Sequence, residues 1–184
     1  YYYVHVSGGV IEKHIDVTSG EVLYNEIHEG KEGEPYDIPS KTFAGYDLVE
    51  TRLPTNNSGT MEINTIEVKY YYIKKAEITI KYIDKITGNE LTQAIVLNGH
   101  EGDTYTTENK TFENYDLIKL PENNSGSMPG GKTTITYEYV HISAGVMERH
   151  YDINTNQLLE PETKHTGHQG DSYTTEAKEF TGYD

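Results

Sequence analysis

The chain has 184 residues with a formal net charge of −15 at pH 7, and it contains no cysteine. A negative field of this size repels nucleic acid and anionic lipid, so we expect no nucleic-acid partner. The absence of cysteine excludes disulfides, thiolate nucleophiles and cysteine-type zinc sites. No apolar run reaches the length of a membrane-spanning helix, so we expect no membrane insertion by this segment.

One module recurs along the chain with a period of about 68 residues, as the corresponding positions Asp16, Asp84 and Asp152 illustrate. The period predicts two complete repeats, 9–76 and 77–143. Residues 1–8 match 137–144 and are expected to be the last strand of an upstream repeat, and residues 144–184 an incomplete further repeat. Tandem copies multiply reach and valency, so the array itself indicates a binding or spacing role.

The first segment of the middle repeat, residues 77–84, alternates apolar and polar side chains, which predicts a half-buried strand. Asp84 and Gly88 then favour a turn, in which the carboxylate accepts backbone hydrogen bonds and the glycine adopts a positive φ. A second strand near residues 90–98 would complete a β-hairpin.

Residues 112–117 show no helical periodicity, and we expect their aromatic and leucine side chains to cover the open side of the sheet in a short helix or turn. Turn-rich loops at 53–59 and 120–126 each lead into a long closing strand. Each closing strand carries an alternating stripe that is predicted to point inward: Val68, Tyr70 and Tyr72 in one, and Ile135, Tyr137 and Tyr139 in the other.

The connections between repeats, 73–76 and 140–145, are too short and too poor in proline and serine for flexible linkers. We therefore expect mainly β or α+β modules stacked end to end as an elongated, monomeric rod.

The middle repeat carries a series of spaced motifs at residues 78–84, 88–91, 99–105, 115–117, 124–126 and 135–139. These motifs resemble the mucin-binding-protein (MucBP) repeat of Gram-positive surface proteins. The resemblance covers essentially the whole chain and implies small, sheet-dominated modules related to the ubiquitin-like β-grasp. It also implies an extracellular, cell-wall-anchored adhesin that attaches to mucin or other host glycoprotein glycans. Asn156 and Asn114 stand where other copies have glycine, and asparagine tolerates the same turn conformation.

The repeats differ in their first strand, where the flanking copies carry a Glu-x-His pair. Glu12 with His14, and Glu148 with His150, stand where the middle repeat has Ile80 and Tyr82. Such a pair can ligate a metal together with one further ligand, or hydrogen-bond a sugar hydroxyl. The alternative is a solvated strand face or an ion pair within the module. No third ligand stands at a fixed spacing, so we predict no metal site.

Tyrosine rings commonly stack on the apolar faces of sugars. Tyr71 and its counterpart Tyr2 are predicted to point outward from the closing strands, and are candidate ligand contacts alongside the two Glu-x-His pairs.

No catalytic motif, phosphate loop or cofactor motif is present, so we predict neither an enzyme nor a cofactor. The favoured function is an adhesin whose repeats bind mucin or other host glycans weakly and multivalently. The first alternative is a passive stalk that holds another domain away from the cell wall. The second is homotypic assembly through exposed strand edges.

Overall fold

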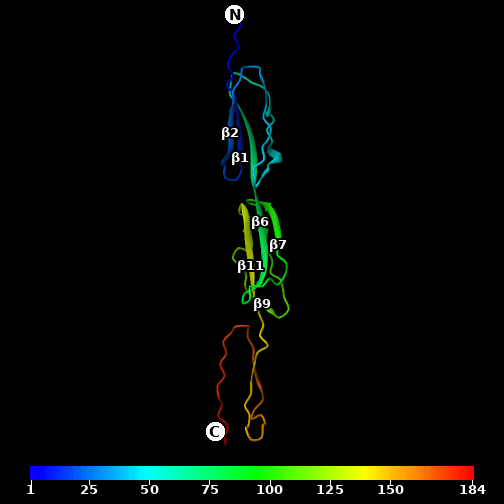
Figure 1. Cartoon of the computed structure of the whole chain (residues 1–184), viewed down its shortest axis with the longest axis vertical. Coiled ribbons are helices and arrows are strands. Elements are labelled where there is room, and N and C mark those ends of the chain that lie inside the picture. Colours follow the sequence, from blue (N-terminus) through cyan, green and yellow to red (C-terminus); the bar gives the residue numbers. More distant parts are fainter. The chain divides into compact units, whose positions relative to one another are not determined.

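The structure, a computed structural model, describes all residues from 1 to 184, and its regular secondary structure is almost entirely β-strand (Figure 1). Its one regular helix is a single 3-10 turn, η1, at Glu50–Arg52. The mainly β class is therefore confirmed. The strands are β1 (Val10–Asp16), β2 (Val22–His28), β3 (Pro35–Asp37), β4 (Tyr46–Leu48), β5 (Ser58–Thr60), β6 (Ile66–Asp84), β7 (Ile95–His100), β8 (Thr104–Thr106), β9 (Tyr115–Lys119), β10 (Ser125–Ser127), β11 (Gly131–His141), β12 (Val146–Glu148) and β13 (Thr163–His165).

The chain forms two compact units whose boundary falls inside the middle sequence repeat. The first unit contains residues 1–79, 96–106 and 125–134, and the second contains 80–95, 107–124 and 135–184. Each junction between consecutive repeats therefore lies within one unit. No helix in the structure is long and apolar enough to cross a membrane.

The first repeat is a mixed sheet centred on β6. Strand β1 pairs antiparallel with β2 and parallel with β6, and β4 pairs antiparallel with β6. A hairpin whose first strand runs parallel to the closing strand is the sheet arrangement of the expected β-grasp. A short β3–β5 ribbon and η1 occupy the stretch between the hairpin and β6, and no α-helix is present there.

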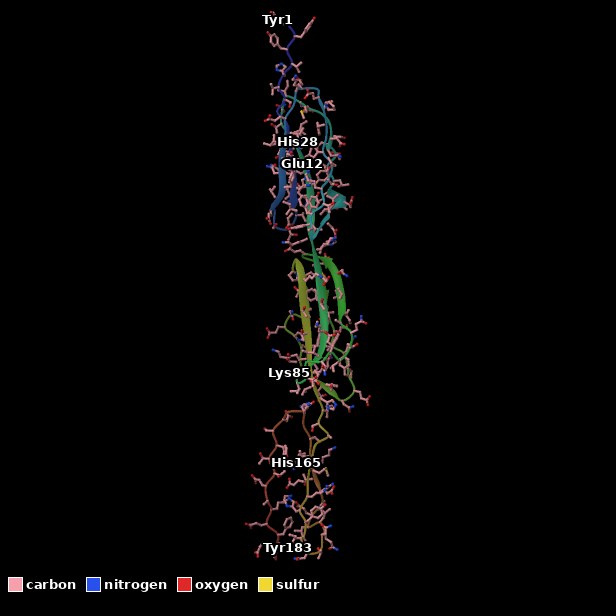
Figure 2. All side chains as sticks on the ribbon, viewed as in Figure 1. Tyr1, Glu12, His28, Lys85, His165 and Tyr183 are labelled. Carbon is pink, nitrogen blue, oxygen red and sulfur yellow. The ribbon has the colours of Figure 1, made fainter.

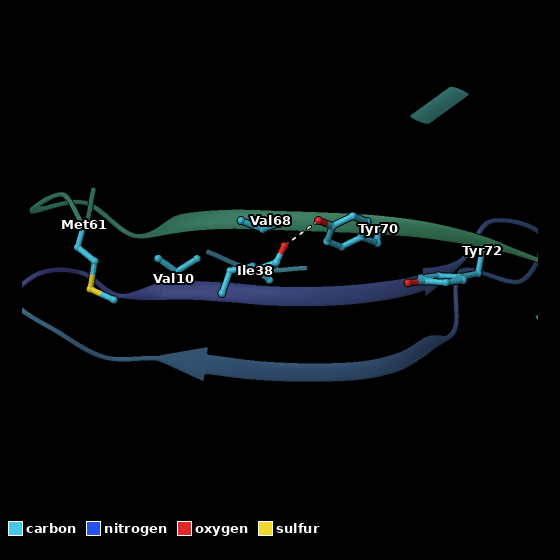
Figure 3. Close-up of a cluster of buried hydrophobic side chains, with 6 residues drawn as sticks. All are labelled: Val10, Ile38, Met61, Val68, Tyr70 and Tyr72. Atoms are coloured by element: carbon cyan, nitrogen blue, oxygen red, sulfur yellow. Dashed lines mark hydrogen bonds between the residues drawn. The ribbon is translucent and has the colours of Figure 1, made fainter. Parts of the chain in front are cut away.

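The core of the first repeat consists of side chains from the inward faces of β1 and β6, together with the segment that covers them (Figure 3). Val68, Tyr70 and Tyr72 are all buried, which confirms the predicted stripe. The Tyr70 hydroxyl donates a 2.7 Å hydrogen bond to the Ile38 carbonyl oxygen, so the covering segment is tied to the sheet as well as packed on it.

Strand β6 runs without interruption from Ile66 to Asp84, through the segment 73–76 that we expected to be a connection between repeats. The alternation continues across this segment, with Ala76 and Ile78 on the buried face, and no proline or glycine interrupts it. One strand therefore closes the first repeat and opens the second. The Lys75 amide donates to the Gly45 carbonyl at 2.8 Å, which anchors the strand at the junction.

The second unit has an aromatic core. Tyr82 stacks on Tyr137 with ring centroids 5.2 Å apart, and Phe112 meets Tyr139 edge-on at 5.0 Å. This packing confirms that the segment containing Phe112 covers the sheet, and it does so through a turn followed by β9.

Two predicted elements differ from the structure. The second strand of the middle repeat, expected near 90–98, is β7 at Ile95–His100, because Glu90 forms only an isolated bridge with Ile83 and the chain bends before Ile95. Residues 1–5 form no strand, and Val6 makes an isolated bridge with Lys31.

The aspartate turns have the expected geometry. Asp84 Oδ1 accepts the Ile86 amide at 2.8 Å, and Gly88 has a φ of 74°. In the third repeat Asn156 occupies the glycine position with a φ of 57°, which confirms that asparagine preserves the turn.

We expect acid to weaken the middle repeat through Asp84. Burial raises the pKa of this carboxyl, but hydrogen bonds from the amides of Ile86 and Thr87 outweigh that effect and lower it overall. A lowered folded-state pKa gives stability that is complete above the unfolded-state value, about 3.9, and is lost as the pH falls through the folded value. Urea unfolding of the D84N variant should therefore depend less on pH between pH 5 and 3 than that of the native chain. Equal dependence in both would contradict this assignment.

Candidate functional site

The inner face of the first hairpin carries a cluster of polar side chains centred on Glu12. In the antiparallel pairing of β1 with β2, Glu12 lies opposite Glu26 and Val10 lies opposite His28, so all these side chains share one face. The Glu12 carboxylate accepts hydrogen bonds from His14 Nε2 at 2.6 Å and His28 Nε2 at 2.8 Å. Figure 2 labels Glu12 and His28 in the first repeat. The Lys41 ammonium lies 3.1 Å from Glu12 Oε1.

His14 connects this carboxylate to the hydrophobic core. Its Nδ1 lies 2.9 Å from the Tyr72 hydroxyl, and its ring is nearly parallel to that of Tyr70, with centroids 5.2 Å apart. The Tyr72 hydroxyl in turn donates to the Lys41 carbonyl oxygen at 2.7 Å. Two strands and the covering segment thus fix the orientation of His14 and, through it, of Glu12.

The charges of the cluster are balanced by its neighbours. Burial alone raises the pKa of Glu12, but hydrogen bonds from His14, His28 and Lys41 lower it overall, which keeps the carboxylate ionised. The pKa of Lys41 is raised, chiefly by its hydrogen bond to Glu12. The cluster is therefore a compensated ionic network inside a β-sheet core.

The same arrangement recurs in the third repeat. Glu148 accepts His150 Nε2 at 2.8 Å on one oxygen and His165 Nε2 at 2.7 Å on the other. The strand pairing is also the same, because Val146 lies opposite His165 as Val10 lies opposite His28. The middle repeat has Ile80, Tyr82 and Leu97 at the corresponding positions. The three polar residues thus occur together or are replaced together.

The structure brings each predicted Glu-x-His pair together and adds a histidine to it. Glu12 and His14 are 1% and 0% exposed, so the ion pair within the module is the arrangement observed, and His14 has no exposed surface with which to touch a ligand. Sequence reasoning missed His28 and His165. Their signal was a shared position two residues before the repeated Gly30 and Gly167.

The predicted tyrosine contacts lie in different surroundings. Tyr71 is half-buried on β6, and the Arg52 guanidinium lies 3.8 Å from its ring centroid. One face of this ring is therefore covered by a cation. Tyr2 is fully exposed in the stretch without a strand before Val6.

A groove of about 370 Å³ lies at the junction of the first two repeats. The Lys74 ammonium stands 5.7 Å from the Tyr46 ring centroid, and the space beside Gly45 and Gly131 is open. The groove is lined by Ala44, Gly45, Tyr46, Lys74, Lys75, Ala76, Glu77, Asn98, Gly130, Gly131 and Lys132.

Ion pairs flank this groove. Asp47 contacts Lys75 at 2.9 Å and His100 Nε2 at 3.0 Å, and the hydrogen bond from Lys75, followed by that from His100, lowers the pKa of Asp47. At the next junction Asp116 contacts His168 in the same way, at 2.8 Å. A second groove, of about 420 Å³, includes His168 in its lining.

These features define a tandem array of small β-sheet repeats with a groove beside each junction. The MucBP domain model matches residues 10–73, 77–140 and 146–184, and the chain belongs to the MucBP domain family.

Among curated proteins, the chain is similar to internalin J of Listeria monocytogenes serovar 1/2a, with 32% identity over 182 residues. That match covers 95% of this chain and 21% of internalin J. The match to internalin I of the same strain is 27% identical over 135 residues and covers 72% of this chain and 7% of the relative. The chain thus spans about a fifth or less of these relatives.

Two solved structures overlap with the chain at low similarity. The crystal structure of Mub-RV aligns with a TM-score of 0.28 and 14% identity, covering 73% of this chain and 98% of that one. The type 2 repeat of the mucus binding protein MUB from Lactobacillus reuteri aligns with a TM-score of 0.27 and 14% identity, covering 72% and 98%.

Proposed function

We propose that this chain is the repeat region of an extracellular, cell-wall-anchored adhesin, and that its repeats bind mucin or other host glycans weakly and multivalently. The observation that carries the proposal is the tandem occurrence of three MucBP matches in one chain. Successive sites on one chain raise the local concentration for one another, so weak single contacts suffice for firm attachment. We take 9–76, 77–143 and 144–184 as the repeating modules.

We further propose that the glycan contacts lie in the junction grooves. The first groove offers what a sugar ring requires: the Tyr46 ring for its apolar face, the exposed Asn98 amide for its hydroxyls, and open backbone at Gly45 and Gly131. Lys74 and Lys132 also line this groove. The Lys132 ammonium is paired with Glu77 at 3.1 Å, so Lys74 supplies the positive charge that would favour acidic sugars. The second groove is lined by histidines and Tyr173 in place of the lysines, so the two proposed glycan sites differ in chemistry.

Filling the first groove should weaken attachment. Ala44 is exposed on its rim, so the A44W variant places a large ring in the groove while leaving the core intact. We expect A44W to reduce binding to immobilised mucin by about fivefold or more, as the loss of one of several linked sites would. Surface plasmon resonance with the native chain and the variant at matched mucin density measures this effect.

The Y71A variant is the matched control for that experiment. It alters the Tyr71–Arg52 pair on the strand surface and leaves the groove unchanged. Weaker binding by Y71A but native binding by A44W would move the contact from the groove to the Tyr71 face.

The alternative function, a spacer that projects another domain, is favoured by the continuity of β6 through the first junction. The Glu101 amide also donates to the Lys74 carbonyl at 2.9 Å, which adds to the Lys75–Gly45 bond. An array without glycan affinity but with slow hydrogen exchange at the Lys75 amide would support the spacer function over the adhesin.

A further inference from the structure

The polar cluster of the first hairpin is open to solvent on the side of Glu26 and His28. We propose that Glu12, Glu26 and His28 bind a divalent transition-metal ion, for which zinc is the best fit. This site is separate from the junction groove and does not depend on glycan binding.

The three ligand atoms already converge. A carboxylate oxygen from Glu12, one from Glu26 and a ring nitrogen of His28 all lie within 4.8 Å of one another. His28 Nε2 is 2.8 Å from Glu12 Oε2 and 3.9 Å from Glu26 Oε2. Zinc binds such atoms at about 2.0–2.2 Å, so small side-chain rotations place one ion among the three. A water molecule would complete a tetrahedral site.

Hydrogen bonds on the buried side of Glu12 fix its carboxylate in the orientation that a metal ligand needs. His14 binds its other oxygen at 2.6 Å, and His14 is itself fixed by Tyr72 at 2.9 Å. Outer partners that orient a ligating carboxylate are a regular feature of metal sites. The solvent side stays open, because the side chains of His28 and Glu26 are 30% and 47% exposed. An ion therefore has both a rigid anchor and an entry path.

The ligand set selects the kind of ion. An imidazole with two carboxylates suits zinc and similar transition metals, whereas calcium and magnesium prefer oxygen ligands alone. The net charge of −15 attracts cations to the chain as a whole.

The third repeat contains a second convergence of two carboxylates and one imidazole, in which His150, the counterpart of His14, is the histidine. Ligand atoms of Glu148, His150 and Glu160 lie within 4.8 Å of one another, and His165 contacts Glu148 at 2.7 Å. The middle repeat lacks the first set, with Ile80, Ile95 and Leu97 at the positions of Glu12, Glu26 and His28. We therefore expect two metal sites in this chain, in the first and third repeats.

Lys41 opposes metal binding in the first repeat. Its ammonium lies 3.1 Å from the Glu12 oxygen that also accepts His14, so it shares the carboxylate with the proposed ion. Removing this positive charge should tighten metal binding, a result that a purely structural cluster does not predict. The K41M variant keeps the aliphatic stem and removes the ammonium.

Isothermal titration calorimetry of the full chain with zinc chloride tests the proposal. We expect two ions per chain. E26Q and H28Q should each weaken one site by about tenfold or more while sparing the other, and E160Q should do the reverse. K41M should tighten the first site. Cobalt(II) added to the same proteins reports tetrahedral coordination through its visible absorption.

Glu29 supplies the matched control, because it is exposed near the site but outside the converging set. E29Q should bind zinc as the native chain does. No zinc binding below millimolar concentration would overturn the proposal. So would binding that is unchanged in both E26Q and H28Q, since the ion would then be held by other histidines.

Discussion

Replacing Glu12 with alanine should lower the free energy of unfolding by about 3–5 kcal/mol, the usual cost of removing one partner from a buried ionic network. In this variant the fully buried His14 loses the carboxylate that accepts its 2.6 Å hydrogen bond. Lys41 and His28 lose their contacts with the same carboxylate. Urea unfolding of E12A and the native chain, followed by the near-ultraviolet circular dichroism of tyrosine, measures the loss.

The chain itself supplies the control for this experiment. The triple variant E12I/H14Y/H28L gives the first repeat the apolar set of the middle repeat, where Tyr82 stacks on Tyr137 as His14 stacks on Tyr70. Replacing a whole buried ionic network by packed apolar groups is often neutral or stabilising. We therefore expect the urea concentration at which the triple variant unfolds to equal or exceed that of the native chain. If the triple variant loses as much free energy of unfolding as E12A, the ionic network stabilises the fold beyond balancing its own buried charges.

The second large effect is expected from Tyr137 in the core of the middle repeat. Its side chain is fully buried, its ring stacks on Tyr82 at 5.2 Å, and its hydroxyl lies 2.8 Å from the Thr107 hydroxyl. Truncation of a large aromatic in such a position costs about 3–5 kcal/mol. The Y137A variant should therefore lose that much stability, as measured by urea unfolding.

Tyr71 provides the comparison for Y137A. It is half-buried, and its main partner is the Arg52 guanidinium, an interaction worth about 0.5–1 kcal/mol at an exposed site. Y71A should therefore lose about 1 kcal/mol or less. Equal losses for Y71A and Y137A would contradict the assignment of inward and outward faces.

Alternation along the strands predicted most of the core, because side chains two residues apart share a face whatever their chemistry. The inward stripe that ends at Tyr72 and the one that ends at Tyr139 follow directly from it. The same rule applied to Glu12 and His14, which align with the buried Ile80 and Tyr82. Their charge left a solvated strand face and an ion pair within the module as open alternatives, although the alignment itself indicated burial.

The partners that permit this burial were not predictable from spacing. His28 reaches Glu12 only through the register of β2, and Lys41 only through the covering segment. The strand shared by the first two repeats was easier to predict from the sequence, because the alternation continues through Ala76 and no residue there ends a strand. The junction groove depends on β7 and the loop before β11 meeting beside Tyr46, which local sequence does not encode.

The most direct test of the adhesin proposal is binding of the native chain to immobilised mucin before and after glycosidase treatment, at low and high mucin density. We expect binding that glycosidase removes and that dissociates more slowly at high density, as linked weak sites require. Binding that survives complete deglycosylation, or no binding at high micromolar concentration, would contradict the account and favour the spacer.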